Sequence, residues 1–312
     1  MKFQIQYTDI PVLLADKHKI DIQYTDIPVI IANKHNIKTL EMRGSAANLF
    51  QQVKLHQSKI SRKINNFIKK KIAAEIVDDF LEIFWDAVEN DRSVVETLSE
   101  LKELYNTIPP KPIYSTGRSA SRVKDINKWL NSLKRKKDVK YLDVGCSEAS
   151  ITETIANALN LKMGDIYGCD IFIIEEPGGK VIFTPSTPTS LPYKDGEFDL
   201  VTTFQALHHF TDPDIMLSEI HRVLKPRGVY IIREHDVRDP SFGVYLDVVH
   251  ALYSVVINSE KTPESFVTTY ESFYHNKEAW SRDYIVPAGF KFAGLVKTND
   301  QFNSYYARYF KV

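Results

Sequence analysis

The chain has 312 residues, and its 40 Lys and Arg balance 40 Asp and Glu, so the formal net charge is zero. Apolar residues make up 43% of the chain and aromatic residues 12%, which excludes a disordered protein and allows one large domain or two. Two cysteines are too few for a disulfide framework, and no stretch approaches about eighteen uncharged apolar residues. We therefore expect a cytoplasmic protein with no membrane insertion.

Residues 1–40 form an N-terminal segment with a tandem repeat. Residues 5–20 recur as residues 22–37, at a period of 17 residues. Two copies are too few for a stacked solenoid, so we interpret the repeat as a duplication without a chemical role. One histidine per copy, His18 and His35, is weak evidence for metal binding, and we expect no metal site.

Residues 41–112 predict a basic helical region. Apolar residues recur at helical spacing from Ile72 to Leu104, and the prolines at 109–112 mark a domain boundary. Residues 1–140 hold 25 Lys and Arg against 17 Asp and Glu. Between Met42 and Ala74 there is no acid, and the basic residues there are Arg43, Lys54, Lys59, Arg62, Lys63, Lys69, Lys70 and Lys71. This asymmetry indicates either a surface that faces nucleic acid or a solvated helix face.

The third segment, 113–312, begins with a predicted helix over about 119–133 and a strand that ends near Val144. A turn of small residues follows, in which Gly145, Ser147 and Ala149 occupy the places of the three glycines in a dinucleotide fingerprint. Ser150 and Glu153 have the spacing of a capping box, which predicts a helix start. This order is typical of the nucleotide half-site of a doubly wound α/β sheet.

Two acids lie at predicted strand ends beside this turn. Asp170 closes the second strand, where a carboxylate binds ribose hydroxyls. Asp143 directly precedes the turn, where it would repel a pyrophosphate but attract the ammonium and sulfonium of S-adenosylmethionine. The sign of this charge favours a methyl donor over NAD, and the missing glycines also disfavour a nicotinamide-dependent dehydrogenase.

The next elements strengthen this interpretation. A turn at Asp195-Gly196 precedes a predicted strand over 198–204, Asp212-Pro213 predicts a helix start, and a further strand covers 229–232. The segments LDVGC, CD, LPYKDGEFDLVTTFQALHHFTDP and LSEIHRVLKPRGVYIIRE, in this order, resemble the class I S-adenosylmethionine-dependent methyltransferases, in particular the type 11 (UbiE-like) branch. The resemblance covers about residues 113–312.

The resemblance implies an α/β fold with a doubly wound, seven-stranded, mostly parallel sheet and an antiparallel last strand, here preceded by a helical N-terminal region. Predicted strands at 290–296 and 305–310 supply the end of that sheet. It also implies a set of residues that bind the donor, S-adenosyl-L-methionine: Asp143, Gly145, Ser147, Asp170, Thr187 and Gln205. Thr187 stands where the family often has an acid that contacts the adenine amine. From the helix before the first strand, Tyr114, Arg118 and Arg122 are expected near the site.

The acceptor side is expected at the ends of the fourth and fifth strands, where His208, His209, Glu234, His235 and Asp236 stand. His235 and His208 are the candidate catalytic residues, because a histidine there can deprotonate a hydroxyl or ring nitrogen near neutral pH. Residues 238–278 exceed an ordinary connection and predict a helical lid over the acceptor.

The predicted activity is methyl transfer to an O or N nucleophile. The acceptor stays open at this point: the basic stretch favours RNA, and the family resemblance favours a small molecule. The alternative is a catalytically inert partner subunit that binds S-adenosylmethionine, in view of Ser147, Ala149 and Thr187.

Overall fold

A computed structural model describes residues 32–33, 36–37, 42–109, 116–172 and 179–312. The tandem repeat lies largely outside these ranges, as does Tyr114. The described part of the repeat forms an antiparallel pair of two-residue strands, Ala32–Asn33 (β1) and Asn36–Ile37 (β2).

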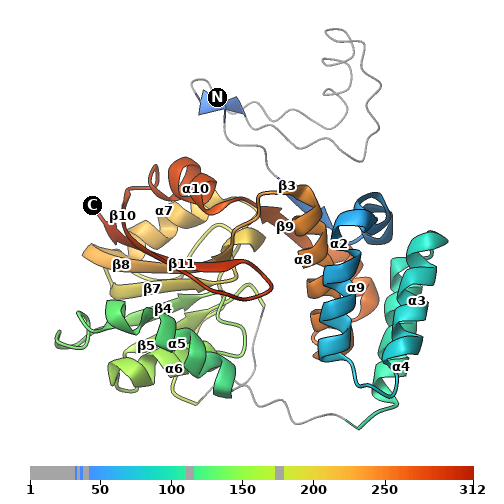
Figure 1. Ribbon diagram of the computed structural model, residues 1–312. Coiled ribbons are helices and arrows are strands. Elements are labelled where there is room, and N and C mark those ends of the chain that lie inside the picture. The colour runs from blue at the N-terminus through green and yellow to red at the C-terminus, as the bar shows by residue number, and fades with distance from the viewer. Residues whose placement is uncertain (1–31, 34–35, 38–41, 110–115, 173–178) are drawn as a thin grey trace.

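In the described part of the chain, seven strands form one sheet in the order β10-β11-β8-β7-β4-β5-β6 (Figure 1). β11 pairs antiparallel with both of its neighbours, and the pairs from β8 to β6 are parallel. This confirms the predicted seven-stranded sheet with an antiparallel last strand. The strands are Tyr141–Val144 (β4), Ile166–Cys169 (β5), Ile182–Phe183 (β6), Phe198–Phe204 (β7), Leu224–His235 (β8), Phe290–Lys297 (β10) and Ser304–Lys311 (β11).

Helices cover both faces of the sheet (Figure 1). One face carries Thr116–Leu130 (α5) and Ser150–Leu159 (α6); the other carries Pro213–Val223 (α7), Lys277–Ala279 (α10) and a π-helical turn at Trp280–Ile285 (η3). Consecutive strand residues point to opposite faces, so Leu200 joins the cluster under α5 and α6 while Val201 joins the cluster under α7. Burial on both faces explains why the central strands are continuously apolar.

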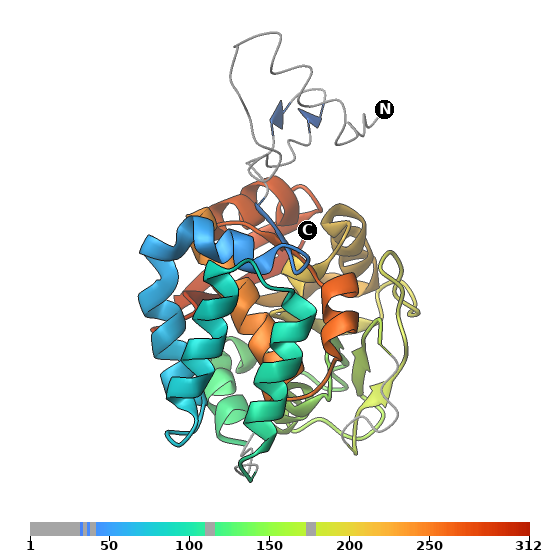
Figure 2. The same cartoon turned by 90° about the vertical axis from the view of Figure 1, so that its right-hand side faces the viewer.

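The remaining helices form a second body, which we call the helical region (Figure 2). It contains Leu49–Lys71 (α2), Val77–Glu89 (α3), Val94–Asn106 (α4), Pro240–Ala251 (α8), a π-helical turn at Leu252–Ile257 (η2) and Pro263–Thr269 (α9). All six contribute side chains to one hydrophobic cluster. The predicted basic helices and the predicted lid therefore share a single core, although more than a hundred residues separate them in the chain.

One helical stretch, Pro240–Ile257, is long and apolar enough to cross a membrane by length and composition. Of this stretch, 72% is buried inside the protein, where it packs against α2 and α4. Packing in the core of the helical region accounts for its apolar sequence.

A two-stranded sheet links the start of the helical region to the chain after α9. Met42–Ser45 (β3) pairs antiparallel with Glu271–Tyr274 (β9). β9 also contacts a short 3-10 helix, Leu207–His209 (η1), which follows β7 in the large sheet. The helical region is thereby held against the edge where β7 and β8 end.

Candidate active site

The turn after β4 keeps the backbone of a glycine-rich loop with only one glycine. Gly145, Ser147 and Ala149 have φ angles of 75°, 47° and 62°, all in the left-handed region. A Cβ on Gly145 would lie 2.5 Å from the Cβ of Ala206, so only glycine fits there. The predicted capping box is wrong: Ala149 is the N-cap of α6 and makes no side-chain cap, because the left-handed turn extends to that residue.

The left-handed turn predicts that Ser147→Gly stabilises the fold. Ser147 is exposed and gives up only a hydrogen bond to the neighbouring Glu148, while glycine removes a backbone cost of about 1 kcal/mol. We expect the free energy of unfolding in urea to rise by about that amount. Ser150→Gly, at the helical start of α6, is the control and should lower it; a destabilised Ser147→Gly variant would contradict the strain argument.

Asp170 lies beside this turn, directly after β5. Its carboxylate accepts hydrogen bonds from the backbone N–H groups of Ser147 at 3.1 Å and Phe172 at 3.3 Å. Ile171 and Phe172 are 53% and 55% exposed, which is unusual for large apolar side chains. The sequence analysis missed this pair, although apolar residues directly after a strand-ending acid were the available signal.

Asp143 is enclosed beneath the turn. Its carboxylate accepts hydrogen bonds from the hydroxyls of Thr152 and Thr202, both at 2.6 Å, and so ties β4 to α6 and β7. Burial raises the pKa of this carboxyl to about 6, against the effect of the two hydroxyl donors. The contact of Asp143 with the ammonium of the donor stays a prediction.

This raised pKa predicts a pH-dependent stability. Because the folded protein holds the proton more tightly than the unfolded chain, whose Asp has a pKa of 3.8, the stabilisation is complete below about pH 3.8 and lost as pH rises through about 6. Relative to Asp143→Asn, the wild-type free energy of unfolding should fall by about 3 kcal/mol between those limits. Urea unfolding of both proteins at a series of pH values measures this difference, and a difference independent of pH would contradict it.

Thr187 lies in an exposed turn, where its hydroxyl accepts a hydrogen bond from the backbone N–H of Thr189 at 3.4 Å. The N–H of the preceding residue, Ser186, donates to the carbonyl of Asp170 at 2.9 Å. The turn therefore lies beside the end of β5, and the contact of Thr187 with adenine stays a prediction.

Gln205 lies between the residues predicted to bind the methyl donor and those predicted to bind the methyl acceptor. It directly follows β7 with a φ of 58°, and its side-chain oxygen accepts a hydrogen bond from Arg122 at 3.0 Å. Its amide nitrogen lies 3.1 Å from Nε2 of His235. Arg122 thus contacts a candidate site residue, whereas the side chain of Arg118 lies outside the described part of the structure.

Glu234, at the end of β8, makes several contacts on the predicted acceptor side. Its carboxylate accepts backbone hydrogen bonds from Leu207, His208 and His235, at 3.0, 3.4 and 3.2 Å, and lies 2.7 Å from Nδ1 of His208. Burial raises the pKa of this carboxyl, while the backbone N–H groups of His235 and His208 oppose the shift. Glu234 therefore fixes η1 against the end of β8.

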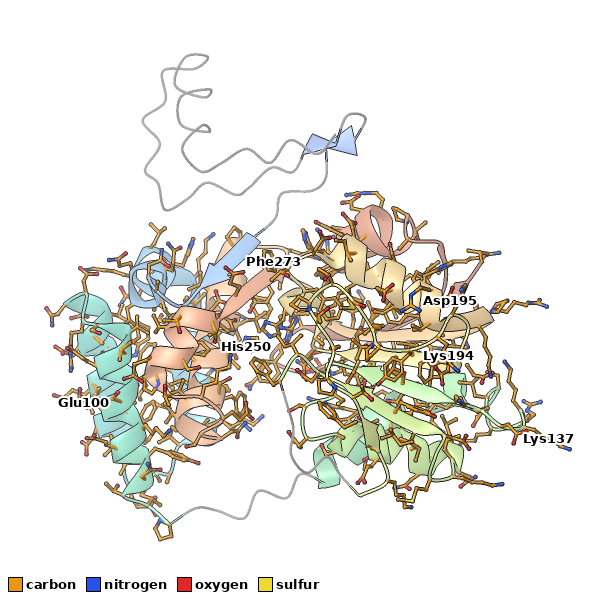
Figure 3. All side chains as sticks on the ribbon, turned by 180° about the vertical axis from the view of Figure 1, so that it is seen from behind. Glu100, Lys137, Lys194, Asp195, His250 and Phe273 are labelled. Carbon is orange, nitrogen blue, oxygen red and sulfur yellow. The ribbon has the colours of Figure 1, made fainter. Side chains whose placement is uncertain are left out.

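Four imidazoles gather here, and we call them the histidine cluster: His208, His209, His235 and His250. The ring of His208 lies 4.2 Å from His209, 5.3 Å from His235 and 5.4 Å from His250, between ring centroids. His250 lies on α8, at the side of the helical region that faces the sheet (Figure 3). The sequence analysis missed it, because nothing in the sequence of a core helix marks which face meets the sheet.

Burial also sets the charge of the cluster. It lowers the pKa of His235 to about 3 and holds those of His208 and His250 well below the usual value, with neighbouring imidazoles adding to the shift. These rings are neutral at neutral pH. A ring with so low a pKa holds a proton poorly, which weakens the interpretation of His235 as a general base.

Asp236, the last acceptor-side candidate, has a different environment. Its carboxylate pairs with Lys277 at 2.9 Å and Arg238 at 3.3 Å, and it accepts a hydrogen bond from the N–H of Lys277. These contacts secure the start of α10 and leave Asp236 outside the histidine cluster.

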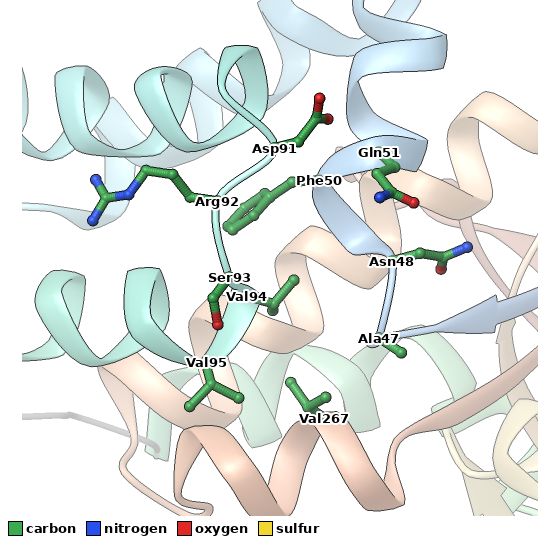
Figure 4. Close-up of a pocket in the computed structure, with 10 residues that line it drawn as sticks. All are labelled: Ala47, Asn48, Phe50, Gln51, Asp91, Arg92, Ser93, Val94, Val95 and Val267. Carbon is green, nitrogen blue, oxygen red and sulfur yellow. The ribbon is translucent and has the colours of Figure 1, made fainter.

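A cleft of about 250 Å³ opens elsewhere, between the start of α2, the α3–α4 connection and Val267 (Figure 4). Its polar lining comes from Asn48, Gln51, Asp91, Arg92 and Ser93. The turn, Asp170 and the histidine cluster take no part in the lining, so we assign the cleft no role in the candidate site.

Comparison with known proteins agrees with this geometry. Residues 142–232 match a family described as a methyltransferase domain, of type 11. A demethylmenaquinone methyltransferase of Streptomyces avermitilis is 37% identical over 92 residues, which cover 28% of this chain and 40% of that protein. The ubiquinone/menaquinone biosynthesis C-methyltransferase UbiE of Blochmanniella pennsylvanica is 39% identical over 74 residues, 24% of this chain and 28% of that protein.

The chain thus spans less than half of the length of these two relatives. Among solved structures, an S-adenosylmethionine-dependent methyltransferase from Aquifex aeolicus is 18% identical, with a TM-score of 0.42, over 69% of this chain and 98% of its own. The matched residues 142–232 contain the turn, Asp143, Asp170 and Gln205, and this part of the chain is a methyltransferase domain of type 11.

Proposed function

We propose that the protein transfers a methyl group from S-adenosylmethionine to a small hydroxylated ring compound, such as a quinol, bound at the histidine cluster. One short segment, residues 205–208, carries this proposal. Ala206 packs against Gly145 of the turn, while Gln205 contacts His235 and His208 contacts Glu234. A donor on the turn and an acceptor at the cluster would therefore be neighbours.

The chemistry needs alignment more than it needs a reactive side chain. The nucleophile attacks the methyl carbon, the C–S bond breaks with its electron pair moving to sulfur, and the acceptor gives up a proton. In a hydroxylated ring, loss of the O–H proton makes both the oxygen and an adjacent ring carbon nucleophilic. The names of the relatives, one of them a C-methyltransferase, support a ring of this kind. Analysis of the product would show whether the ring oxygen or the ring carbon receives the methyl group.

The contacts of the basic stretch favour a small acceptor over RNA. Lys54 pairs with Asp91 at 2.9 Å and Lys59 pairs with Asp239 at 3.2 Å. Two more lysines of the stretch lie over aromatic rings of the helical region: Lys63 over Phe242 and Lys71 over Tyr253. Four of the eight basic residues thus make contacts within the protein, as residues on a solvated helix face do.

The proposal is tested by incubating the protein with S-adenosylmethionine tritiated in its methyl group and, separately, a panel of reduced quinols or total RNA. We expect label in a quinol fraction and none in RNA, with transfer lost in Asp170→Ala. Label in RNA that falls steeply with salt would favour the RNA acceptor instead. Donor binding without transfer to any acceptor would favour the inert partner subunit.

A further inference from the structure

We propose that His208, His235 and His250 form a zinc-binding site. One ring nitrogen from each residue lies within 4.8 Å of the other two. The three residues come from η1, the end of β8 and α8, so the site would join the sheet to the helical region. The site itself is independent of the proposed function, and only its role toward the acceptor rests on that function.

The hydrogen bonds of the three rings define which nitrogen faces the site. Each Nδ1 lies against an oxygen that accepts a hydrogen bond. Nδ1 of His208 lies 2.7 Å from Oε2 of Glu234. Nδ1 of His235 lies 2.9 Å from the carbonyl of Phe302, and Nδ1 of His250 lies 2.9 Å from the carbonyl of Leu246. Glu234 is an acceptor because its oxygens already receive three backbone N–H groups. Each Nδ1 therefore carries the hydrogen, and each Nε2 presents a lone pair.

This arrangement is the one that orients metal-binding histidines. A ligand imidazole almost always donates its second ring N–H to a carboxylate or a backbone carbonyl, which fixes the ring and its tautomer. Here one carboxylate and two carbonyls do so. Glu234 also places a negative charge one hydrogen bond behind the site, which offsets part of the charge of a divalent ion.

One ring nitrogen of the site is buried without a hydrogen-bond partner. Among the residues that the structure describes, Nε2 of His208 is buried and has no hydrogen-bond partner. Nε2 of His235 accepts a hydrogen bond from the amide nitrogen of Gln205 at 3.1 Å, which a bound metal ion would replace. A metal ion would give the buried Nε2 of His208 the partner that it lacks.

Zinc is commonly bound by three neutral imidazoles in a tetrahedral geometry, which leaves the fourth coordination position of the ion open. Ligand nitrogens about 2.1 Å from a tetrahedral ion lie about 3.4 Å apart, so the rings need to close by up to roughly 1.4 Å. His250 is only half-buried on α8, so a small rotation of its ring could supply part of this movement. Its Nδ1 also lies 3.1 Å from the hydroxyl of Tyr270, which can keep the ring oriented.

At the open position the ion would bind an oxygen. If an acceptor hydroxyl replaced bound water there, a zinc ion would favour loss of the hydroxyl proton to solvent and would stabilise the resulting oxyanion. The imidazoles would then need to act only as ligands.

The site is tested on the full chain after removal of metal with a chelator and dialysis. Titration with zinc chloride in a calorimeter gives stoichiometry and affinity, and cobalt(II) added in place of zinc reports coordination through its visible spectrum. We expect one zinc per chain, and affinity at least about 100-fold weaker in His208→Gln and in His250→Gln. His221→Gln, a partly buried histidine on α7 outside the cluster, is the matched control and should bind as the wild type does.

A folded wild-type protein that takes up no zinc would overturn the site, as would unchanged affinity in a folded His250→Gln variant. His250 is half-buried, so its variant serves if His208→Gln does not fold. Binding of S-adenosylmethionine, measured in parallel, separates the two proposals. Donor binding without zinc overturns only the site, and zinc binding without donor binding overturns only the proposed function.

Discussion

Replacing His235 with alanine is expected to lower kcat for methyl transfer by at least about 100-fold while the affinity for S-adenosylmethionine is unchanged. The ring lies at the end of β8, and its two nitrogens lie 2.9 Å from the carbonyl of Phe302 and 3.1 Å from the amide nitrogen of Gln205. Under the proposed function, its loss should remove a group beside the acceptor and leave the contacts to the methyl donor in place.

Single-turnover kinetics and calorimetry with the donor measure these two quantities. His221→Ala, outside the cluster, is the control and should change neither. A His235→Ala variant with weakened donor binding would place this residue on the donor side or give it a structural role. An unchanged kcat would remove it from the reaction.

Among changes near the predicted donor site, Gly145→Val is expected to lower both the stability of the fold and the affinity for S-adenosylmethionine the most. The φ angle of 75° excludes a β-branched side chain, and its Cβ would meet the Cβ of Ala206 at 2.5 Å. We expect a loss of about 2–4 kcal/mol in the free energy of unfolding, and donor affinity lowered by at least about 100-fold as the turn shifts.

The matched control for this variant is Gly179→Val, where a Cβ meets nothing within 4 Å. Urea unfolding and donor calorimetry on both variants separate a local clash from a general intolerance of valine. A Gly145→Val protein that binds the donor as the wild type does would show that the turn does not form the donor site.

The sheet was the part of the fold that the sequence predicts well. The strand predicted over 198–204 is β7. The strand predicted over 290–296 ends one residue before β10 does, and the strand predicted over 305–310 is one residue shorter than β11 at each end. Burial on both faces gives these strands continuous apolar runs, and such runs are local in the sequence. The capping box failed because the left-handed backbone of the turn, and not the side chain of Ser150, determines where α6 begins.

The histidine cluster shows the limit of sequence reasoning. His208 follows β7 and His235 ends β8. Because neighbouring parallel strands end at the same edge of a sheet, the sequence predicts that these two residues meet. His250 stands 15 residues further on, inside an apolar helix, at no spacing that metal sites use. It reaches the cluster only because α8 shares a core with α2, α3 and α4, and that packing depends on contacts between distant segments.

The central claim, that the turn and Asp170 bind a methyl donor, is tested most directly by calorimetry of the wild-type protein and Asp170→Ala with S-adenosylmethionine and with NAD. We expect the wild type to bind S-adenosylmethionine and not NAD. Asp170→Ala should weaken donor binding by about 1–3 kcal/mol, because a charged hydrogen bond to the ribose is lost. Binding of NAD in preference to S-adenosylmethionine, or unchanged donor affinity in a folded Asp170→Ala variant, would contradict the account.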